Sequence, residues 1–83
     1  MTVQRVSSTS SNNSSSPKFA TVSCPATTRV LGGGFQIGGV TNGSVEVTYA
    51  YPNSDTTFTA SATEEQLTQT SQPWTITVWA LCA

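Results

Sequence analysis

The sequence predicts an all-β fold, a small antiparallel β-sandwich of about six strands, and three observations lead to this prediction. From Lys18 onward the chain is rich in valine, threonine, tyrosine, phenylalanine and tryptophan, the residue types that strands favour. Glycine, proline and asparagine separate these segments at short intervals. Two cysteines, Cys24 and Cys82, span most of the same region, so a disulfide between them would close nearly the whole domain.

Two alternatives stay open at this point. Six short strands with a similar alternation of apolar and polar residues can also form a barrel instead of a sandwich. The cysteines either form a disulfide or are two buried free thiols. A disulfide that closes a loop of this size stabilises the fold by about 4 kcal/mol. A chain of 83 residues has room for one core and is marginally stable without such a cross-link or a covering subunit.

The N-terminal segment differs in composition from the rest. Residues 3–6 are expected to form a short first strand, and residues 7–16 are nearly all serine, threonine and asparagine. Such a run buries too little apolar surface to order itself. We therefore expect residues 1–17 to hold a strand and a flexible loop, or a linker to a preceding domain, and residues 18–83 to form the β-sandwich domain.

The next segments alternate as strands do. Ala20, Val22 and Cys24 share one face, and residues 25–28 make a turn. Residues 29–37 form a strand that three glycines interrupt at 32–34, which indicates a bulge or a place where the ring of Trp74 or Trp79 lies against bare backbone. A phosphate-binding loop is the weaker interpretation, because the following Lys-Ser/Thr is missing.

Residues 41–44 contain Asn-Gly and predict a hairpin turn. In the strand that follows, Val45, Val47, Tyr49 and Tyr51 alternate with polar residues, which places both tyrosines on the apolar face. A further strand has Phe58, Ala60 and Ala62 on one face. Only residues 64–70 have helical potential, and one or two turns are unstable in isolation.

The last strand carries two different faces. Its first face is apolar throughout and consists of Trp74, Ile76, Val78, Ala80 and Cys82. The opposite face begins polar and ends apolar, with Thr75, Thr77, Trp79, Leu81 and Ala83. We therefore expect a second sheet, a loop or a second subunit to cover Trp79 and Leu81.

Composition excludes several classes of function. Three Lys and Arg against four Asp and Glu give a formal net charge of −1, without the basic stripe that nucleic acids or anionic membranes require. No apolar run is long enough to span a bilayer, so no membrane insertion is expected. The N-terminus lacks a secretory signal pattern, which indicates a mature fragment or an excised terminal domain. Two cysteines without any histidine make no zinc site, and no cofactor is expected.

Catalysis is not expected either. The chain has no histidine, so no Ser-His-Asp or Cys-His arrangement is possible. Glu64 and Glu65 are adjacent in a polar segment, which predicts solvated surface charge. The sequence does contain residue types that bind sugars. Aromatic rings combine with hydrogen-bonding side chains on such surfaces, and the candidates here are Tyr51, Asn53, Asp55 and Trp79. Aromatic residues at strand spacing are, however, more often part of the core.

The combined motifs resemble a known small domain. Residues 20–25 read ATVSCP, residues 29–35 RVLGGGF, residues 49–52 YAYP and residues 73–83 PWTITVWALCA. Over residues 19–83 this order is similar to a cysteine-paired β domain that recurs in exported bacterial proteins and at the C-terminal ends of phage tail fibres. One departure is the turn after the first cysteine, Ala26-Thr27-Thr28, where the resemblance leads us to expect glycine.

The resemblance implies a non-catalytic terminal domain with paired cysteines, located outside the cell or on the virion surface. It implies a homotrimeric fibre that binds a host receptor, a cell-surface glycan or protein, and/or assembles the trimer. In this interpretation Trp79, Leu81 and the exposed threonine rows form subunit contacts, and the tip consists of the turn residues Asn42, Gly43, Asn53 and Asp55. The alternatives are a monomeric secreted or cell-surface bacterial structural domain without a dedicated ligand, and a trimerisation clamp without a receptor.

Overall fold

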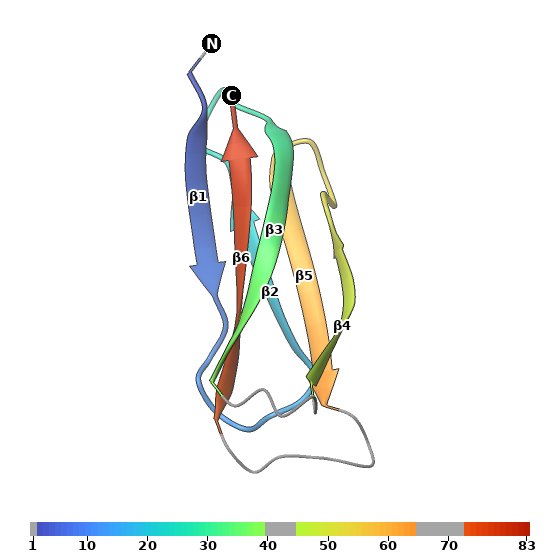
Figure 1. Ribbon diagram of the computed structural model, residues 1–83. Coiled ribbons are helices and arrows are strands. Elements are labelled where there is room, and N and C mark those ends of the chain that lie inside the picture. Colours follow the sequence, from blue (N-terminus) through green and yellow to red (C-terminus); the bar gives the residue numbers. More distant parts are fainter. Residues whose placement is uncertain (1, 40–44, 65–72) are drawn as a thin grey trace.

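The computed structural model describes residues 2–39, 45–64 and 73–83. Within these ranges two three-stranded antiparallel sheets pack face to face, which confirms the predicted sandwich (Figure 1). The strands are β1 (Gln4–Thr9), β2 (Lys18–Ser23), β3 (Val30–Gly39), β4 (Val45–Tyr51), β5 (Thr57–Glu64) and β6 (Trp74–Cys82). We call β1–β6–β3 the β6 sheet and β2–β5–β4 the β5 sheet, after their central strands.

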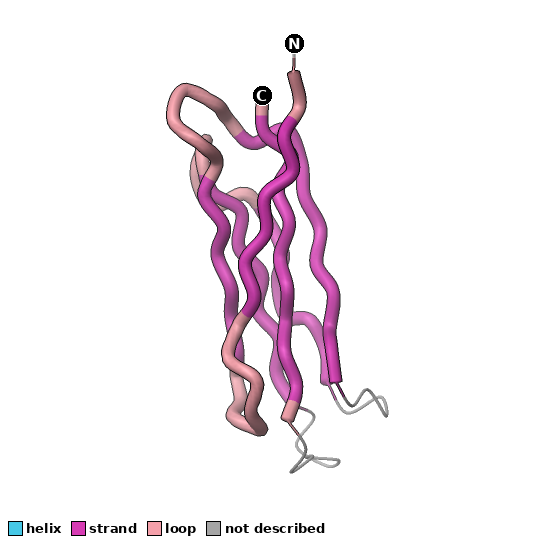
Figure 2. Tube along the Cα trace, turned by 90° about the vertical axis from the view of Figure 1, so that its left-hand side faces the viewer, coloured by secondary structure: helices cyan, strands magenta, loops and turns pink. Residues whose placement is uncertain are grey.

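All strands run along the long axis of the molecule, so the described connections gather at its two ends (Figure 2). One end holds both cysteines and the β4–β5 loop, and we call it the disulfide end. Lys18, Glu64 and Trp74 lie at the first or last position of their strands at the opposite end, which we call the lysine end. Both chain termini lie at the disulfide end (Figure 1).

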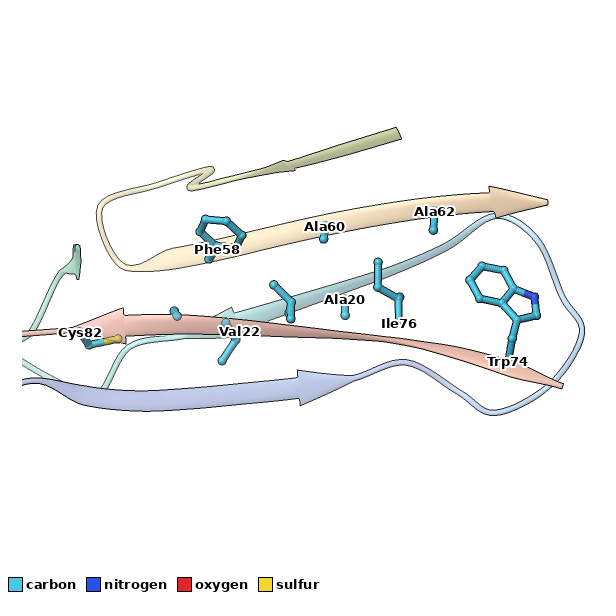
Figure 3. Close-up of a cluster of buried hydrophobic side chains, with 10 residues drawn as sticks. Ala20, Val22, Phe58, Ala60, Ala62, Trp74, Ile76 and Cys82 are labelled. Atoms are coloured by element: carbon cyan, nitrogen blue, oxygen red, sulfur yellow. The ribbon is translucent and has the colours of Figure 1, made fainter. Parts of the chain in front are cut away.

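The core follows from the alternation in β6. Its five inward side chains, Trp74, Ile76, Val78, Ala80 and Cys82, are all 0% exposed because β6 is the centre of its sheet and faces the other sheet (Figure 3). The β5 sheet contributes Phe58 and several small residues, Ala20, Val22, Ala60 and Ala62. The predicted two-faced pattern of the last strand is therefore confirmed.

The glycine segment of β3 contains the predicted bulge, a register shift between Val30 and Gly32. The ring that lies against its backbone is Phe58 and not a tryptophan, because a Cβ on Gly33 would come within 2.8 Å of the Phe58 ring and would also collide with the Trp79 carbonyl oxygen. Gly33 thus brings the edge of the β6 sheet close to the β5 sheet.

β1 extends further than the predicted strand of residues 3–6, because the serine-rich segment pairs with β6. Ser7 lies opposite Trp79, and the Thr9 hydroxyl is 2.9 Å from that of Thr77. The run then continues along β6, where the Trp74 amide donates to the Asn13 carbonyl at 2.9 Å. Backbone pairing and hydroxyl contacts, which composition does not reveal, place this polar segment on the sandwich.

The prediction that Tyr49 and Tyr51 lie on the apolar face of their strand is wrong. A register irregularity at Thr48 separates Val47, which pairs with Ala62, from Tyr49, which pairs with Ser61. The extra residue reverses the alternation, so that the tyrosines are 44% and 50% exposed on the outer side of the β5 sheet.

The turn predicted at residues 25–28 is present, with the Thr28 amide donating to the Pro25 carbonyl at 3.1 Å. The hairpin turn predicted at residues 41–44 lies outside the described residues. So does the helical candidate at 64–70, except for Glu64, which ends β5.

Candidate functional site

The disulfide between Cys24 and Cys82 is formed and joins residues 58 positions apart. Cys24 follows β2 and Cys82 ends β6, so the bond cross-links the β5 sheet to the β6 sheet. Backbone hydrogen bonds surround it: the Cys24 amide donates to Thr56 O at 2.7 Å. This end of the sandwich is therefore held by both covalent and polar contacts.

An open pocket of about 340 Å³ lies at the disulfide end. Its lining comes from the start of β3 and from the loop between β4 and β5, and consists of Arg29, Val30, Pro52, Asn53, Ser54 and Asp55. We call it the disulfide-end pocket. The two segments are joined directly, because the Val30 amide donates to the Asp55 carbonyl at 2.8 Å.

The loop that forms one wall has its own hydrogen bonds. The Thr57 hydroxyl donates to Asn53 Oδ1 at 2.6 Å and also lies 2.6 Å from the Ser54 hydroxyl. The Ser54 hydroxyl in turn accepts from the Thr56 amide at 3.2 Å. These contacts fix the loop while the amide nitrogen of Asn53 is not engaged by them, so the wall is preorganised and still has donors to offer.

The chemistry of the pocket is that of a site for a hydroxyl-rich ligand. Arg29 and Asp55 are both exposed and line the same pocket, and in the described part of the chain they form no ion pair with each other. The guanidinium donates hydrogen bonds and the carboxylate accepts them, while Val30 and Pro52 supply apolar contact. Four of the six lining residues are polar or charged, so this pocket is more hydrophilic than most small-ligand sites, which suits a ligand rich in hydroxyl groups.

The structure brings together two of the four predicted ligand contacts. Asn53 and Asp55 line the disulfide-end pocket. Tyr51 immediately precedes Pro52 but lies on the outer side of the β5 sheet, opposite Thr59. Trp79 lies on the outer side of the β6 sheet, so it is on the opposite side of the sandwich from Tyr51 and does not line the disulfide-end pocket.

Sequence reasoning missed Arg29 and Ser54 as pocket residues. Ser54 lies between Asn53 and Asp55, so the polar turn that predicted those two residues also indicates Ser54. Arg29 lies 26 positions before Asp55 in the printed sequence, and the backbone hydrogen bond from the Val30 amide to the Asp55 carbonyl joins their two segments.

The second predicted site, the subunit contact of Trp79 and Leu81, lies on the outer face of the β6 sheet. Leu81 and Leu31 are 42% and 56% exposed. Trp79 lies between Ser7 and Gly34 in the sheet, and a Cβ built on Gly32 or Gly34 would meet nothing within 4 Å. This face is apolar at Trp79 and Leu81, beside a strip of bare glycine backbone, while Arg5 lies opposite Leu81 and the remaining outward positions of β1 and β6 are Ser and Thr. No described segment covers it.

At the lysine end the charged groups Lys18 and Glu64 are buried, and each is bonded to neighbouring protein groups. Lys18 is 4% exposed, its Nζ lies 4.9 Å from the centre of the Trp74 ring, and it donates to Asn13 Oδ1 and to Ser15 Oγ. Trp74 Nε1 donates to Glu64 Oε1 at 3.2 Å. The expectation that Glu64 is a solvated surface charge is wrong, because it is 8% exposed and accepts this hydrogen bond. Glu65 lies outside the described residues.

The described residues contain no group of three or more His, Cys, Asp and Glu side chains able to hold a metal ion. No helix in the described ranges has the length and apolar character to cross a bilayer.

Comparisons with family models, with curated proteins and with solved structures find no match for this chain. What the structure establishes is a small disulfide-linked all-β domain.

Proposed function

We propose that this chain is a non-catalytic carbohydrate-binding domain that holds a cell-surface glycan in the disulfide-end pocket. The observation that carries the proposal is the presence of Arg29 and Asp55 in one pocket with Asn53, without an ion pair between these two charges, on a wall fixed by the disulfide and by loop hydrogen bonds. Sugar hydroxyls donate to a carboxylate and accept from a guanidinium or an amide, and sugar C–H groups pack against Val30 and Pro52.

In this proposal the domain stands at the C-terminal end of a phage tail fibre or a related surface fibre. The motif order over residues 19–83 supports this placement. A shallow open pocket binds a sugar weakly, and several copies on one fibre convert weak single-site binding into avidity. Host recognition by repeated sites therefore fits a small pocket on a rigid sandwich.

The test is a glycan array probed with the purified chain and with Asp55→Asn and Asn53→Ala variants. We expect binding to a defined set of glycans, and a loss of about tenfold in affinity for each variant, since each removes a hydrogen bond to the ligand. Asn12→Ala is the matched control, because Asn12 is an exposed asparagine in the loop at the lysine end. Binding that survives both pocket substitutions would contradict the proposal.

A second candidate function is trimer assembly through the outer face of the β6 sheet. The exposure of Leu31 and Leu81 near Trp79 favours it, since a second copy of the chain would remove these apolar side chains from water. We expect light scattering after size exclusion to give the mass of three chains, and Leu81→Glu to give one chain. A wild-type mass of one chain would remove this candidate and favour a monomeric exported structural domain.

A further inference from the structure

The outer side of the β5 sheet carries exposed rings along both of its edges. Phe19 on β2 is 68% exposed, and Tyr49 and Tyr51 on β4 are 44% and 50% exposed. Between them lie the outward hydroxyl residues of β5, namely Thr57, Thr59, Ser61 and Thr63. We call these seven residues the stacking face.

The register shows how the rings flank the hydroxyl strip. Ser61 lies between Phe19 and Tyr49 in one row across the sheet. In the next row Thr59 lies between Thr21 and Tyr51. Thr59 and Ser61 are only 6% and 7% exposed although none of the described strands covers this side, because the larger neighbours flank them.

The central hydroxyls are already engaged within the sheet. Thr59 donates to the Ala20 carbonyl at 3.1 Å and lies 2.9 Å from the Thr21 hydroxyl, and Ser61 donates to the Lys18 carbonyl at 3.1 Å. The floor of the stacking face therefore offers few free hydrogen-bonding groups. A ligand on this face would be held mainly by contact with the rings.

The tyrosines are on this side only because of the irregularity at Thr48, whose hydroxyl donates to the Ser61 carbonyl at 3.1 Å. Without the extra residue the alternation would direct both rings into the core. They form an edge-to-face pair with centroids 5.6 Å apart and planes at 73°, which presents two differently oriented ring surfaces. Bulges that redirect side chains are common beside functional sites.

The charge of this side indicates the class of ligand. The outward positions of β2 and β5 carry no charged side chain, and on β4 only Glu46 does, opposite Thr63 near the lysine end. An uncharged face matches an uncharged ligand and gives nothing to a phosphate-rich or acidic polymer.

We propose that the stacking face binds the internal units of a neutral polysaccharide chain, with Phe19, Tyr49 and Tyr51 stacking on the sugar rings. This inference rests on the proposed function for the carbohydrate class, and it adds that the ligand is a neutral polymer. Tyr51 directly precedes Pro52 of the disulfide-end pocket, so the stacking face and the pocket adjoin along the chain at the end of β4.

The test is affinity electrophoresis of the full chain in gels that contain dextran, galactomannan or mixed-linkage β-glucan, with hyaluronan as the charged comparison. We expect at least one neutral polymer to retard the wild type, and Phe19→Ala and Tyr49→Ala to weaken that binding about tenfold each. Phe35→Ala is the matched control, because Phe35 is 45% exposed on β3 of the other sheet. Thermal unfolding of each variant verifies that it is folded, and Tyr49→Phe, which keeps the ring, is expected to retain binding.

Unchanged retardation in Phe19→Ala and Tyr49→Ala, retardation by hyaluronan alone, or no retardation by any neutral polymer would overturn this inference. Asp55-dependent binding on the glycan array would then still support the pocket and the proposed function. Conversely, ring-dependent retardation in Asp55→Asn, together with an array signal that does not depend on Asp55, would support the stacking face and overturn the pocket.

Discussion

The two ends of the sandwich are both rich in polar and charged groups, and they use them in opposite ways. At the lysine end, Lys18 and Glu64 are buried and bonded through Trp74 and Asn13. At the disulfide end, Arg29 and Asp55 are exposed and line one pocket without pairing. The difference shows two ways to stabilise the ends of a small sandwich. A buried polar network stabilises the lysine end, and a covalent bond stabilises the disulfide end.

This difference has a functional consequence. A buried charge must be paired and hydrogen-bonded, so Lys18 and Glu64 are committed to stability. At the disulfide end the Cys24–Cys82 bond provides the cross-link, so the nearby polar side chains are free to meet a ligand. The predictions below test this division of roles, from the largest expected effect on stability to the smallest.

Removing the disulfide is expected to have the largest effect. The Cys24→Ser/Cys82→Ser variant should lose about 4 kcal/mol of unfolding free energy, because the bond closes a long loop and joins the two sheets. Urea unfolding followed by tryptophan fluorescence measures this loss. A decrease below about 1 kcal/mol would mean that the polar contacts alone hold the disulfide end together.

Breaking the network at the lysine end is expected to cost less. Lys18→Met keeps a long unbranched side chain but removes the ammonium group. Asn13 Oδ1 and Ser15 Oγ then lose this donor, and the Trp74 ring loses its cation contact. We expect a loss of about 2 kcal/mol. Arg5→Met is the control, since Arg5 is exposed and its replacement should change stability by less than about 0.5 kcal/mol. Equal stability of the two variants would contradict a structural role for Lys18.

The lysine end also shows what sequence can and cannot reveal. The alternation of β6 predicted all five of its buried side chains, because strand periodicity depends only on local order. The serine-rich segment was expected to be flexible, and its backbone contacts to β6 are long-range. Composition cannot predict such contacts.

The same limit applies to the candidate sites. Asn53 and Asp55 were predicted because a polar turn is visible in the sequence, while Arg29 joins them only through a tertiary contact between the start of β3 and the β4–β5 loop. Tyr49 and Tyr51 were assigned to the core because one extra residue at Thr48, invisible to a periodicity argument, reverses the side on which they lie.

The turn beside Cys24 offers a way to strengthen the disulfide end. Thr27 has a φ of 67°, in the left-handed region that β-branched residues disfavour, at the third position of a turn that prefers glycine there. Thr27→Gly should therefore raise the unfolding free energy by about 0.5–1 kcal/mol. Thr28→Gly is the opposing control, because it removes the hydroxyl that donates to the Pro25 carbonyl at 2.6 Å. If both substitutions lower the thermal midpoint equally, the strain at Thr27 is refuted.

The smallest effect is expected in the pocket itself. Arg29→Gln, Asp55→Asn and the double variant should each change stability by less than about 0.5 kcal/mol, because both side chains are exposed and unpaired with each other. A double-mutant cycle by urea unfolding should give a coupling energy near zero. A coupling energy above about 1 kcal/mol would mean that Arg29 and Asp55 stabilise the fold through each other. The two ends of the sandwich would then not differ in the role of their charged groups.

The most direct test is two-dimensional amide NMR of the labelled chain, titrated with an oligosaccharide selected on the glycan array. The account predicts shifts at Arg29, Val30, Asn53, Ser54 and Asp55, with the amides of Asn13 and Trp74 unchanged at the lysine end. Shifts confined to the lysine end, or saturating binding that leaves the residues of the disulfide-end pocket unmoved, would contradict it.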